Sequence, residues 1–358
     1  MTKILENITQ INNSYEKVNN SHEKSANNTH CCNEHNPQNV RIIPLLLDTL
    51  AQPHTRLGQK HTNTLETYKK RARAKYLGNA LVLELVKIDS PLTKSYWNTW
   101  HCSIVILQDG KKLTSTYCNN RWCPICNRIR TAKLIKSYLP ELNKMKEPQF
   151  VTLTIPNVSG KVLKSTIEGM TKEFIKIKNL FYGRRSFRIN GIRKTEVTYN
   201  PEANEYHPHF HVILDGRNVG EELINEWLSR YPDANRGAQD IRDADENSML
   251  ELFKYATKLT TKNRITKEED KTVIEVNPKA LDTIYQALYK KRMFQSMGWV
   301  KQVSEDIDEV DAQIVEDVDE DVEVWKWEQE ASDWVSGAGE LLTGCDACER
   351  YELRVDTG

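Results

Sequence analysis

Three histidines occupy alternate positions in the segment HPHFH at residues 207–211. Alternate side chains of a β-strand lie on one face, so His207, His209 and His211 are predicted to share a face while Phe210 points into the core. Two imidazoles at i and i+2 can bind one divalent cation, and Glu196 lies on the β-branched segment just before them. A hairpin would bring Glu196 to His209 and His211. This predicts a metal site with positions open for substrate oxygens.

A tyrosine follows a glutamate by four residues in the run ELFKY, which we expect on a helix. The spacing puts Glu251 and Tyr255 on one helix face. Attack of the Tyr255 hydroxyl on a phosphodiester would form a covalent phosphotyrosyl link, which conserves the bond energy for religation. Lys254 or Lys258 would hold the phosphate or favour the phenolate. Two rival nucleophiles, which we expect to be structural, are Tyr285 and Tyr289.

Four cysteines follow the pattern C-x15-C-x4-C-x2-C, which suits a tetrahedral Zn²⁺ ion. Four protein ligands would close such a site, so the zinc would be structural. The alternative is a group of buried free thiols, and His101 could substitute for the first cysteine. The predicted ligands are Cys102, Cys118, Cys123 and Cys126. Cys345 and Cys348 form a second, isolated CxxC that we expect to be incidental.

The net charge of zero hides a strong asymmetry. Residues 301–358 hold 19 acidic and 4 basic residues, a balance of −15, which leaves 46 basic and 31 acidic residues, +15, in the first 300. A basic body favours a polyanionic partner, and nucleic acid is the first candidate. The basic run around the cysteines is expected to face phosphates. It comprises Arg121, Arg128, Arg130 and Lys133.

Hydrophobic periodicity places these residues on elements. Helices are expected within residues 41–87, from residue 125 to 140 or 146, and over 162–181, 221–228, 247–259 and 278–294. Strands are expected at residues 149–155, 192–199, 207–214 and 238–242. The predicted regions are a disordered arm (1–40), a helical segment (41–95), a zinc-binding module (96–148), a catalytic domain (149–303) and an acidic, largely disordered tail (304–358).

Four of these features occur in a fixed order: the cysteine module, the strand at residues 150–154, the His209–His211 pair and the Glu251–Tyr255 motif. In this order they resemble the plasmid rolling-circle replication initiator (Rep) proteins of the HUH endonuclease superfamily, in the branch with one nucleophilic tyrosine. The resemblance spans roughly residues 96–300. It implies an α+β fold whose HUH core is a central antiparallel sheet flanked by helices. A zinc-binding module and a helical N-terminal segment would precede this core.

The resemblance also implies roles for individual residues. Mg²⁺ or Mn²⁺ would be held by His209, His211 and Glu196, and Tyr255 would join the 5′ phosphate and leave a free 3′-OH. Glu251 would activate water in the closing step, with Lys254 beside the tyrosine. Further candidates for DNA contact or for support of the metal ligands are His207, Lys258 and Arg193.

The implied partners are plasmid origin DNA, single-stranded or extruded at the nick, together with a host helicase and DNA polymerase. A homodimer is compatible with this reading. The sequence shows neither an export signal nor an apolar stretch of membrane-spanning length, so we expect a bacterial cytoplasmic protein. Three alternatives stay open: a single-strand transposase or relaxase of the same superfamily, a metal-dependent nuclease that uses water, and a zinc-stabilised DNA-binding protein without catalysis.

Overall fold

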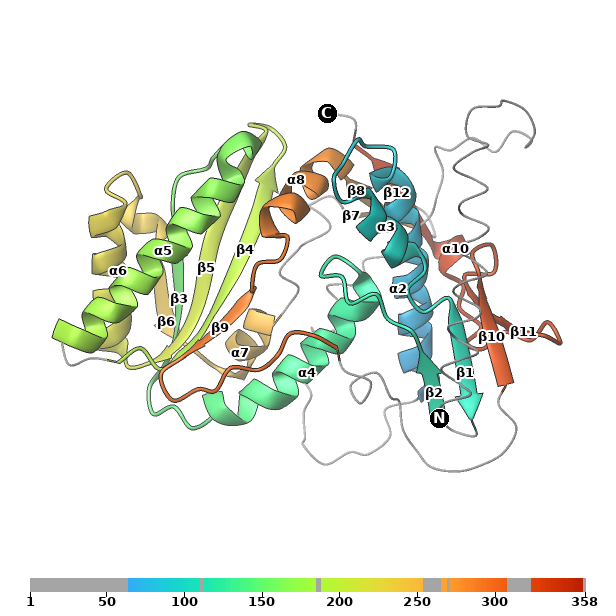
Figure 1. The fold of residues 1–358 in the computed structure, drawn as a ribbon, viewed down its shortest axis with the longest axis horizontal. Coiled ribbons are helices and arrows are strands. Elements are labelled where there is room, and N and C mark those ends of the chain that lie inside the picture. The colour runs from blue at the N-terminus through green and yellow to red at the C-terminus, as the bar shows by residue number, and fades with distance from the viewer. Residues whose placement is uncertain are drawn as a thin grey trace. The chain divides into compact units, whose positions relative to one another are not determined.

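The computed structural model describes residues 64–109, 112–184, 188–253, 265–268, 271–307 and 323–356. A five-stranded sheet, in which every neighbouring pair is antiparallel, lies in the left half of Figure 1. The strand order is β6-β3-β5-β4-β9. The strands are β3 (Pro148–Thr154), β4 (Gly191–Asn200), β5 (Glu205–Asp215), β6 (Asp240–Asp243) and β9 (Phe294–Met297).

Helices α5 (Gly160–Arg184) and α6 (Arg217–Arg230) cover one face of this sheet. Their apolar residues recur every three or four positions, so each helix presents one stripe to the strands. Phe174 of α5 and Trp227 of α6 are fully buried against Phe210 of β5. Even-numbered residues of β5 therefore build a dry core on this side.

The opposite face of the sheet contacts helix α7 (Glu246–Phe253). Phe253 at the end of α7 stacks on Tyr138 of α4 (Pro124–Leu142) and on Phe294 of β9. Odd-numbered residues of β5 point to this side, with Ile213 in the apolar core and the histidines farther along the strand. One face of the sheet thus packs on a purely apolar core, whereas the other face also carries the histidines.

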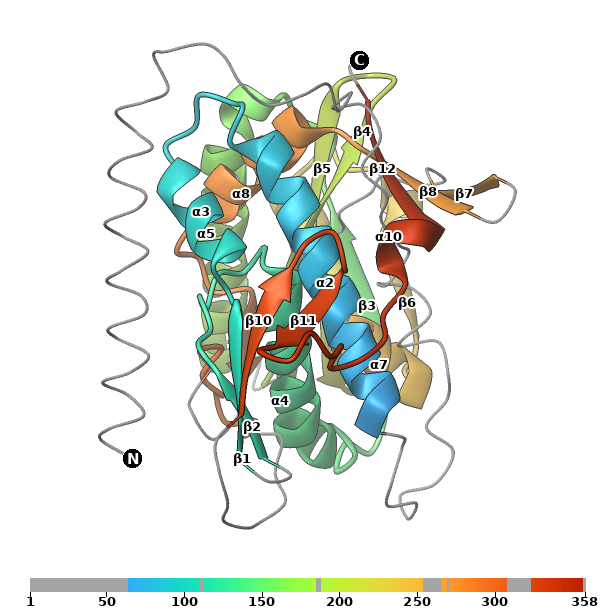
Figure 2. The ribbon, with the colours of Figure 1, turned by 90° about the vertical axis from the view of Figure 1, so that its right-hand side faces the viewer.

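A second group of elements surrounds the cysteines. It contains α2 (Thr64–Leu85), α3 (Thr93–Trp100) and the hairpin of β1 (Val105–Asp109) with β2 (Lys112–Ser115). Residues from the end of the chain complete it: β10 (Glu323–Glu328) pairs with β1, and β11 (Asp333–Ser336) pairs with β10. Figure 2 shows these late strands beside α2.

The predicted disordered tail is wrong for residues 323–356. After β11 the chain forms α10 (Ala347–Arg350) and β12 (Tyr351–Val355), and β12 pairs in parallel with β8 (Lys271–Val276). The acidic composition of this segment suggested disorder, but β10 alternates between exposed and buried residues and buries Trp325. In β11, Trp334 is fully buried. The indole of Trp334 donates a 2.8 Å hydrogen bond to the carbonyl oxygen of Ser103.

The other predicted elements are largely confirmed within the described residues. One correction concerns the helix expected at residues 278–294. Helix α8 (Pro278–Leu288) is shorter because the chain turns at Tyr289 and Lys290, the latter with a φ of 56°, before β9 begins. Strand β7 (Ile265–Glu268) pairs with β8, and neither strand was predicted. Helix α3 and strands β1, β2 and β9 were not predicted either. Among the described residues, no helix is long and apolar enough to cross a membrane.

Candidate metal centres

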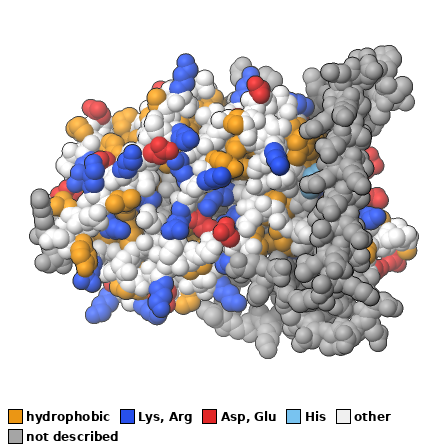
Figure 3. Space-filling view, viewed as in Figure 1, with side chains coloured by type: hydrophobic (Ala, Val, Ile, Leu, Met, Phe, Trp, Pro, Cys, Tyr) orange, Lys and Arg blue, Asp and Glu red, His pale blue; other side chains and the backbone are white. Residues whose placement is uncertain are grey.

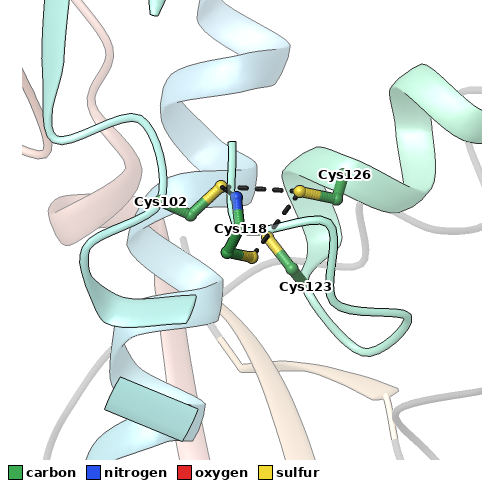
Figure 4. A group of neighbouring side chains, drawn as sticks. All are labelled: Cys102, Cys118, Cys123 and Cys126. Atoms are coloured by element: carbon green, nitrogen blue, oxygen red, sulfur yellow. Dashed lines mark hydrogen bonds between the residues drawn. The ribbon is translucent and has the colours of Figure 1, made fainter. Parts of the chain in front are cut away.

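The four predicted cysteines converge on one point, as Figure 4 shows. The Sγ atom of Cys126 lies 3.5 Å from that of Cys102 and 3.6 Å from that of Cys118. These separations exclude a disulfide, whose sulfurs lie about 2.05 Å apart. Tetrahedral zinc with Zn–S bonds of about 2.3 Å spaces its sulfurs by about 3.8 Å, so the observed cluster fits that ion.

Three separate elements supply these thiols. Cys102 follows α3, Cys118 follows β2, and Cys123 and Cys126 flank the first turn of α4. Pro124 occupies the first helical position, where its fixed φ favours helix initiation and its missing N–H costs no hydrogen bond. The helix N-terminus carries a partial positive charge, which favours thiolates at this position.

A buried cation, Lys75, flanks the cysteine cluster. The Lys75 ammonium is 1% exposed and donates to the carbonyl oxygen of Trp100. Burial lowers the pKa of Lys75 to about 8, while the neighbouring thiols oppose this shift. Burial also raises the pKa of the Cys123 thiol well above its ordinary value. Four thiolates placed this close together would need a cation among them, and a donor set of four sulfurs suits zinc.

The predicted phosphate-facing role of the basic run is wrong for Arg130. Its guanidinium is 5% exposed and donates to the Asn119 side chain at 2.9 Å and to the Glu305 carbonyl oxygen at 2.6 Å. Arg121 forms an ion pair with the Glu305 carboxylate. These hydrogen bonds and the ion pair fix the loop that carries Cys118, so the role of both arginines is structural.

The second predicted cluster lies on the α7 side of the five-stranded sheet. Strands β4 and β5 form the expected hairpin, with Glu196 directly opposite His209 and Lys194 opposite His211. The Nε2 atoms of the two histidines are 3.2 Å apart, and His211 Nε2 lies 3.7 Å from Glu196 Oε2. Ligands on one octahedral Mg²⁺ or Mn²⁺ ion are separated by about 3 Å, so these spacings fit such an ion.

Hydrogen bonds orient both imidazoles. Nδ1 of His209 lies 3.1 Å from the His207 carbonyl oxygen, which can only accept, so Nδ1 carries the proton. The Nε2 lone pair then faces His211 and Glu196. Nδ1 of His211 lies 3.3 Å from Thr152 Oγ1, and the ring packs 5.2 Å from that of Phe150. Such orientation of a ligand's second nitrogen is typical of metal-binding histidines.

Electrostatics also suit cation binding at this cluster. His209 is 7% exposed, and burial lowers its pKa to about 4, so the imidazole is neutral at pH 7. Lys194 donates a 2.7 Å bond to Glu196 Oε2, and both side chains are almost fully buried. An ammonium group at this distance favours the ionised form of a carboxylate. A neutral imidazole beside a carboxylate is the combination that a divalent cation requires.

The residue that sequence reasoning missed is Lys194. A signal was available, because Lys194 precedes Glu196 by two positions and must share its face of the strand. His207 was predicted to contact DNA or to support the metal ligands. Its backbone carbonyl oxygen accepts the hydrogen bond from His209, and its ring stacks 5.1 Å from that of His209. Arg193 points to the opposite, α5-covered side of the sheet, where it contacts Phe210.

The structure places only part of the predicted nucleophile motif. Glu251 lies on α7, and this helix contacts β5, the strand that carries the histidines. Lys254, Tyr255 and Lys258 lie outside the described residues. Of the rival tyrosines, Tyr285 is fully buried and stacks on Trp122, whereas Tyr289 is 45% exposed.

The fold and the two clusters define an α+β protein with one candidate site for a structural zinc ion and one for a divalent cation with open coordination positions. Comparison with known proteins narrows this class. A model of a replication protein family matches residues 110–216. A Staphylococcus aureus protein named rep is 31% identical over 174 residues, which make up 42% of this chain and 74% of that protein. The chain therefore belongs to the replication protein (Rep) family.

Two further relatives carry the same name. The rep protein of Bacillus amyloliquefaciens is 28% identical over 263 residues, or 63% of this chain and 73% of the relative. That of Streptococcus pneumoniae serotype 2 (strain D39 / NCTC 7466) is 27% identical over 210 residues, or 52% of this chain. The alignment spans 62% of the pneumococcal protein. No solved structure matches this chain at a significant level.

Proposed function

We propose that this protein initiates plasmid rolling-circle replication by nicking one strand of the double-strand origin. The observation that carries the proposal is the Glu196–His209–His211 cluster on an antiparallel sheet, in a chain that belongs to the replication protein family. A divalent cation bound there would polarise the scissile phosphate and offset the charge of the transition state. Three side chains among the described residues would ligate the ion, which leaves coordination positions for phosphate oxygens.

The proposed nucleophile is Tyr255, which follows the last residue of α7 by two positions. Its oxygen would attack the phosphorus while the bond to the 3′ oxygen breaks. The phenolic proton passes to a base, and the departing 3′ oxygen takes up a proton to give a free 3′-OH. The 5′ phosphate remains on the tyrosine. Glu251 would activate water in the closing cleavage, with Lys254 or Lys258 holding phosphate.

The remaining assignments follow from the same proposal. The cysteine cluster would hold a structural Zn²⁺ ion, and Mg²⁺ or Mn²⁺ would serve at the histidines. Origin DNA would be single-stranded or extruded at the nick, and a host helicase and polymerase would extend the free 3′-OH. Such a protein works in the bacterial cytoplasm, as a monomer or a homodimer.

The test incubates the protein with a labelled single-stranded oligonucleotide from its own plasmid in the presence of Mn²⁺. A denaturing gel detects covalent protein–DNA adducts for the wild type, for Tyr255→Phe and for the matched control Tyr289→Phe. We expect a metal-dependent adduct that is lost only in Tyr255→Phe. Cleavage without an adduct would indicate a nuclease that uses water. Origin binding without cleavage would indicate a non-catalytic DNA-binding protein.

The same superfamily contains single-strand transposases and relaxases, which share this chemistry. Relaxases usually place the tyrosine before the histidine motif, whereas Tyr255 follows His209 and His211 here. A transposase would cleave terminal transposon ends, and a replication initiator would cleave a plasmid origin. Supplying both oligonucleotides in the adduct assay separates these two activities.

A further inference from the structure

A groove of about 390 Å³ lies on the α5 side of the five-stranded sheet, the side opposite the histidines. Its walls come from α5, from β4 and from the segment that joins α8 to β9. Apolar side chains, among them Ile167, Leu288 and Met293, form part of the lining. The candidate metal site and the zinc-type cluster do not contribute to it.

Arg193 is the unusual member of this lining. It is 2% exposed, and its Nε and Nη1 atoms have no hydrogen-bond partner among the described residues. The guanidinium carbon lies 4.3 Å from the centroid of Phe210 and 4.9 Å from that of Phe174. Contacts with aromatic rings only partly offset the cost of burying a charge, so this arginine lacks the anion that normally accompanies a buried cation.

The strand register explains why Arg193 faces the groove. Arg193 pairs with Gln295 of β9, and residues directly opposite each other in a sheet share one face. Thr195 lies two positions farther along β4, and its backbone N–H donates to the Met293 carbonyl oxygen at 2.9 Å. Arg193, Thr195 and Gln295 therefore all line the groove from the sheet side.

Basic residues also dominate the rim. Among the described residues, Lys172, Lys291 and Arg292 line the groove together with one carboxylate, that of Glu168. Lys291 bonds that carboxylate at 2.6 Å, which leaves Lys172, Arg292 and the deep Arg193 to balance another anion. Figure 3 shows Lys and Arg side chains gathered on this face of the molecule around α5 and α8.

We propose that this groove binds a phosphate group of a nucleotide unit, at a site separate from the candidate metal centre. The planar guanidinium of Arg193 has donors free for two phosphate oxygens, and the rim cations match the charge of a phosphate. The apolar walls suit the sugar or base attached to it. The phosphate belongs either to a DNA strand or to a free nucleotide. This inference goes beyond the proposed nicking reaction and would survive if Tyr255 were not the nucleophile.

The test measures thermal unfolding of the full chain, without chelator, against inorganic phosphate at constant ionic strength set with chloride. Phosphate that binds the folded state raises Tm in a saturable manner. The groove variant is Lys172→Ala with Arg292→Ala, both exposed positions whose replacement leaves the core intact. The matched control, Lys161→Ala with Lys301→Ala, removes two exposed charges outside the groove.

We expect the groove variant to bind phosphate at least tenfold more weakly than the control. An equal response in both variants, or no response beyond chloride, would overturn the proposal. Arg193→Met, which keeps an apolar chain between the two phenylalanines, should abolish the response if it folds. Competition then identifies the source: an oligonucleotide that displaces phosphate far below the concentration of a nucleoside monophosphate indicates a DNA strand, and equal potency indicates a free nucleotide.

Discussion

Replacing His209 by glutamine should remove a large part of the pH dependence of folding stability. Burial lowers the pKa of His209 from 6.5 to about 4, so the unfolded chain takes up a proton before the folded chain does as pH falls. Stability from the neutral imidazole is therefore fully present above pH 6.5 and is lost as pH falls towards 4. Each pKa unit corresponds to about 1.4 kcal/mol, which gives a loss of about 2 kcal/mol at pH 5 and about 3 kcal/mol by pH 4.

The assay is urea unfolding followed by tryptophan fluorescence at pH 7.5 and pH 5.0, without added divalent cation. Chelators must be avoided because they would remove any zinc that the cysteine cluster binds. We expect the wild type to lose about 2 kcal/mol more than His209→Gln between the two values. His207→Gln is the matched control, because it removes a half-buried histidine from the same face of the same strand. Equal losses in wild type and His209→Gln would refute the argument.

Four other predictions test the remaining parts of the molecule. Cys123→Ser should lower both zinc content, measured by atomic absorption, and Tm, and unchanged values would refute the metal assignment. Lys194→Met should leave the Glu196 carboxylate buried without its 2.7 Å ion pair and cost about 3–5 kcal/mol in urea unfolding, whereas a loss below 1 kcal/mol would contradict the buried pair. Glu251→Ala should spare the first nick and impair the closing cleavage in the adduct assay, and loss of the first nick would assign it another role. Trp334→Ala should cost about 3–5 kcal/mol, and an unaltered urea midpoint would show that the C-terminal strands contribute nothing to stability.

Local patterns were sufficient for most of the half of the fold that carries the histidine cluster. The alternation in 207–211 predicted a strand with its histidines on one face, and the β-branched segment before it predicted the hairpin that sets Glu196 opposite His209. Both predictions depend only on the two-residue period of a strand and on a short connection. The cysteine spacing likewise predicted a cluster of four thiols, since three of them lie within nine residues of one another.

Tertiary contacts decided the features that no local window contains. The acidic end of the chain reads as unstructured by composition, yet it folds because β10 pairs with β1, more than 200 residues earlier, and because Trp334 fills a space beside Ser103. The charge of Arg130 and its basic neighbours predicted a contact with phosphate, but the fold surrounds its guanidinium with backbone and side-chain acceptors.

Strand β4 shows most clearly which features the sequence determines and which depend on the tertiary structure. Sequence alone determined that Glu196 and Arg193 lie on opposite faces of β4, because their positions differ by an odd number. The local pattern also predicted that the β4–β5 hairpin brings two histidines to the face that carries Glu196 and Lys194. Only the packed structure decided the surroundings of Arg193, which α5 and β9 enclose in a groove. The period of the backbone sets which way a side chain points, whereas its charge state and ligands depend on the distant segments that surround it.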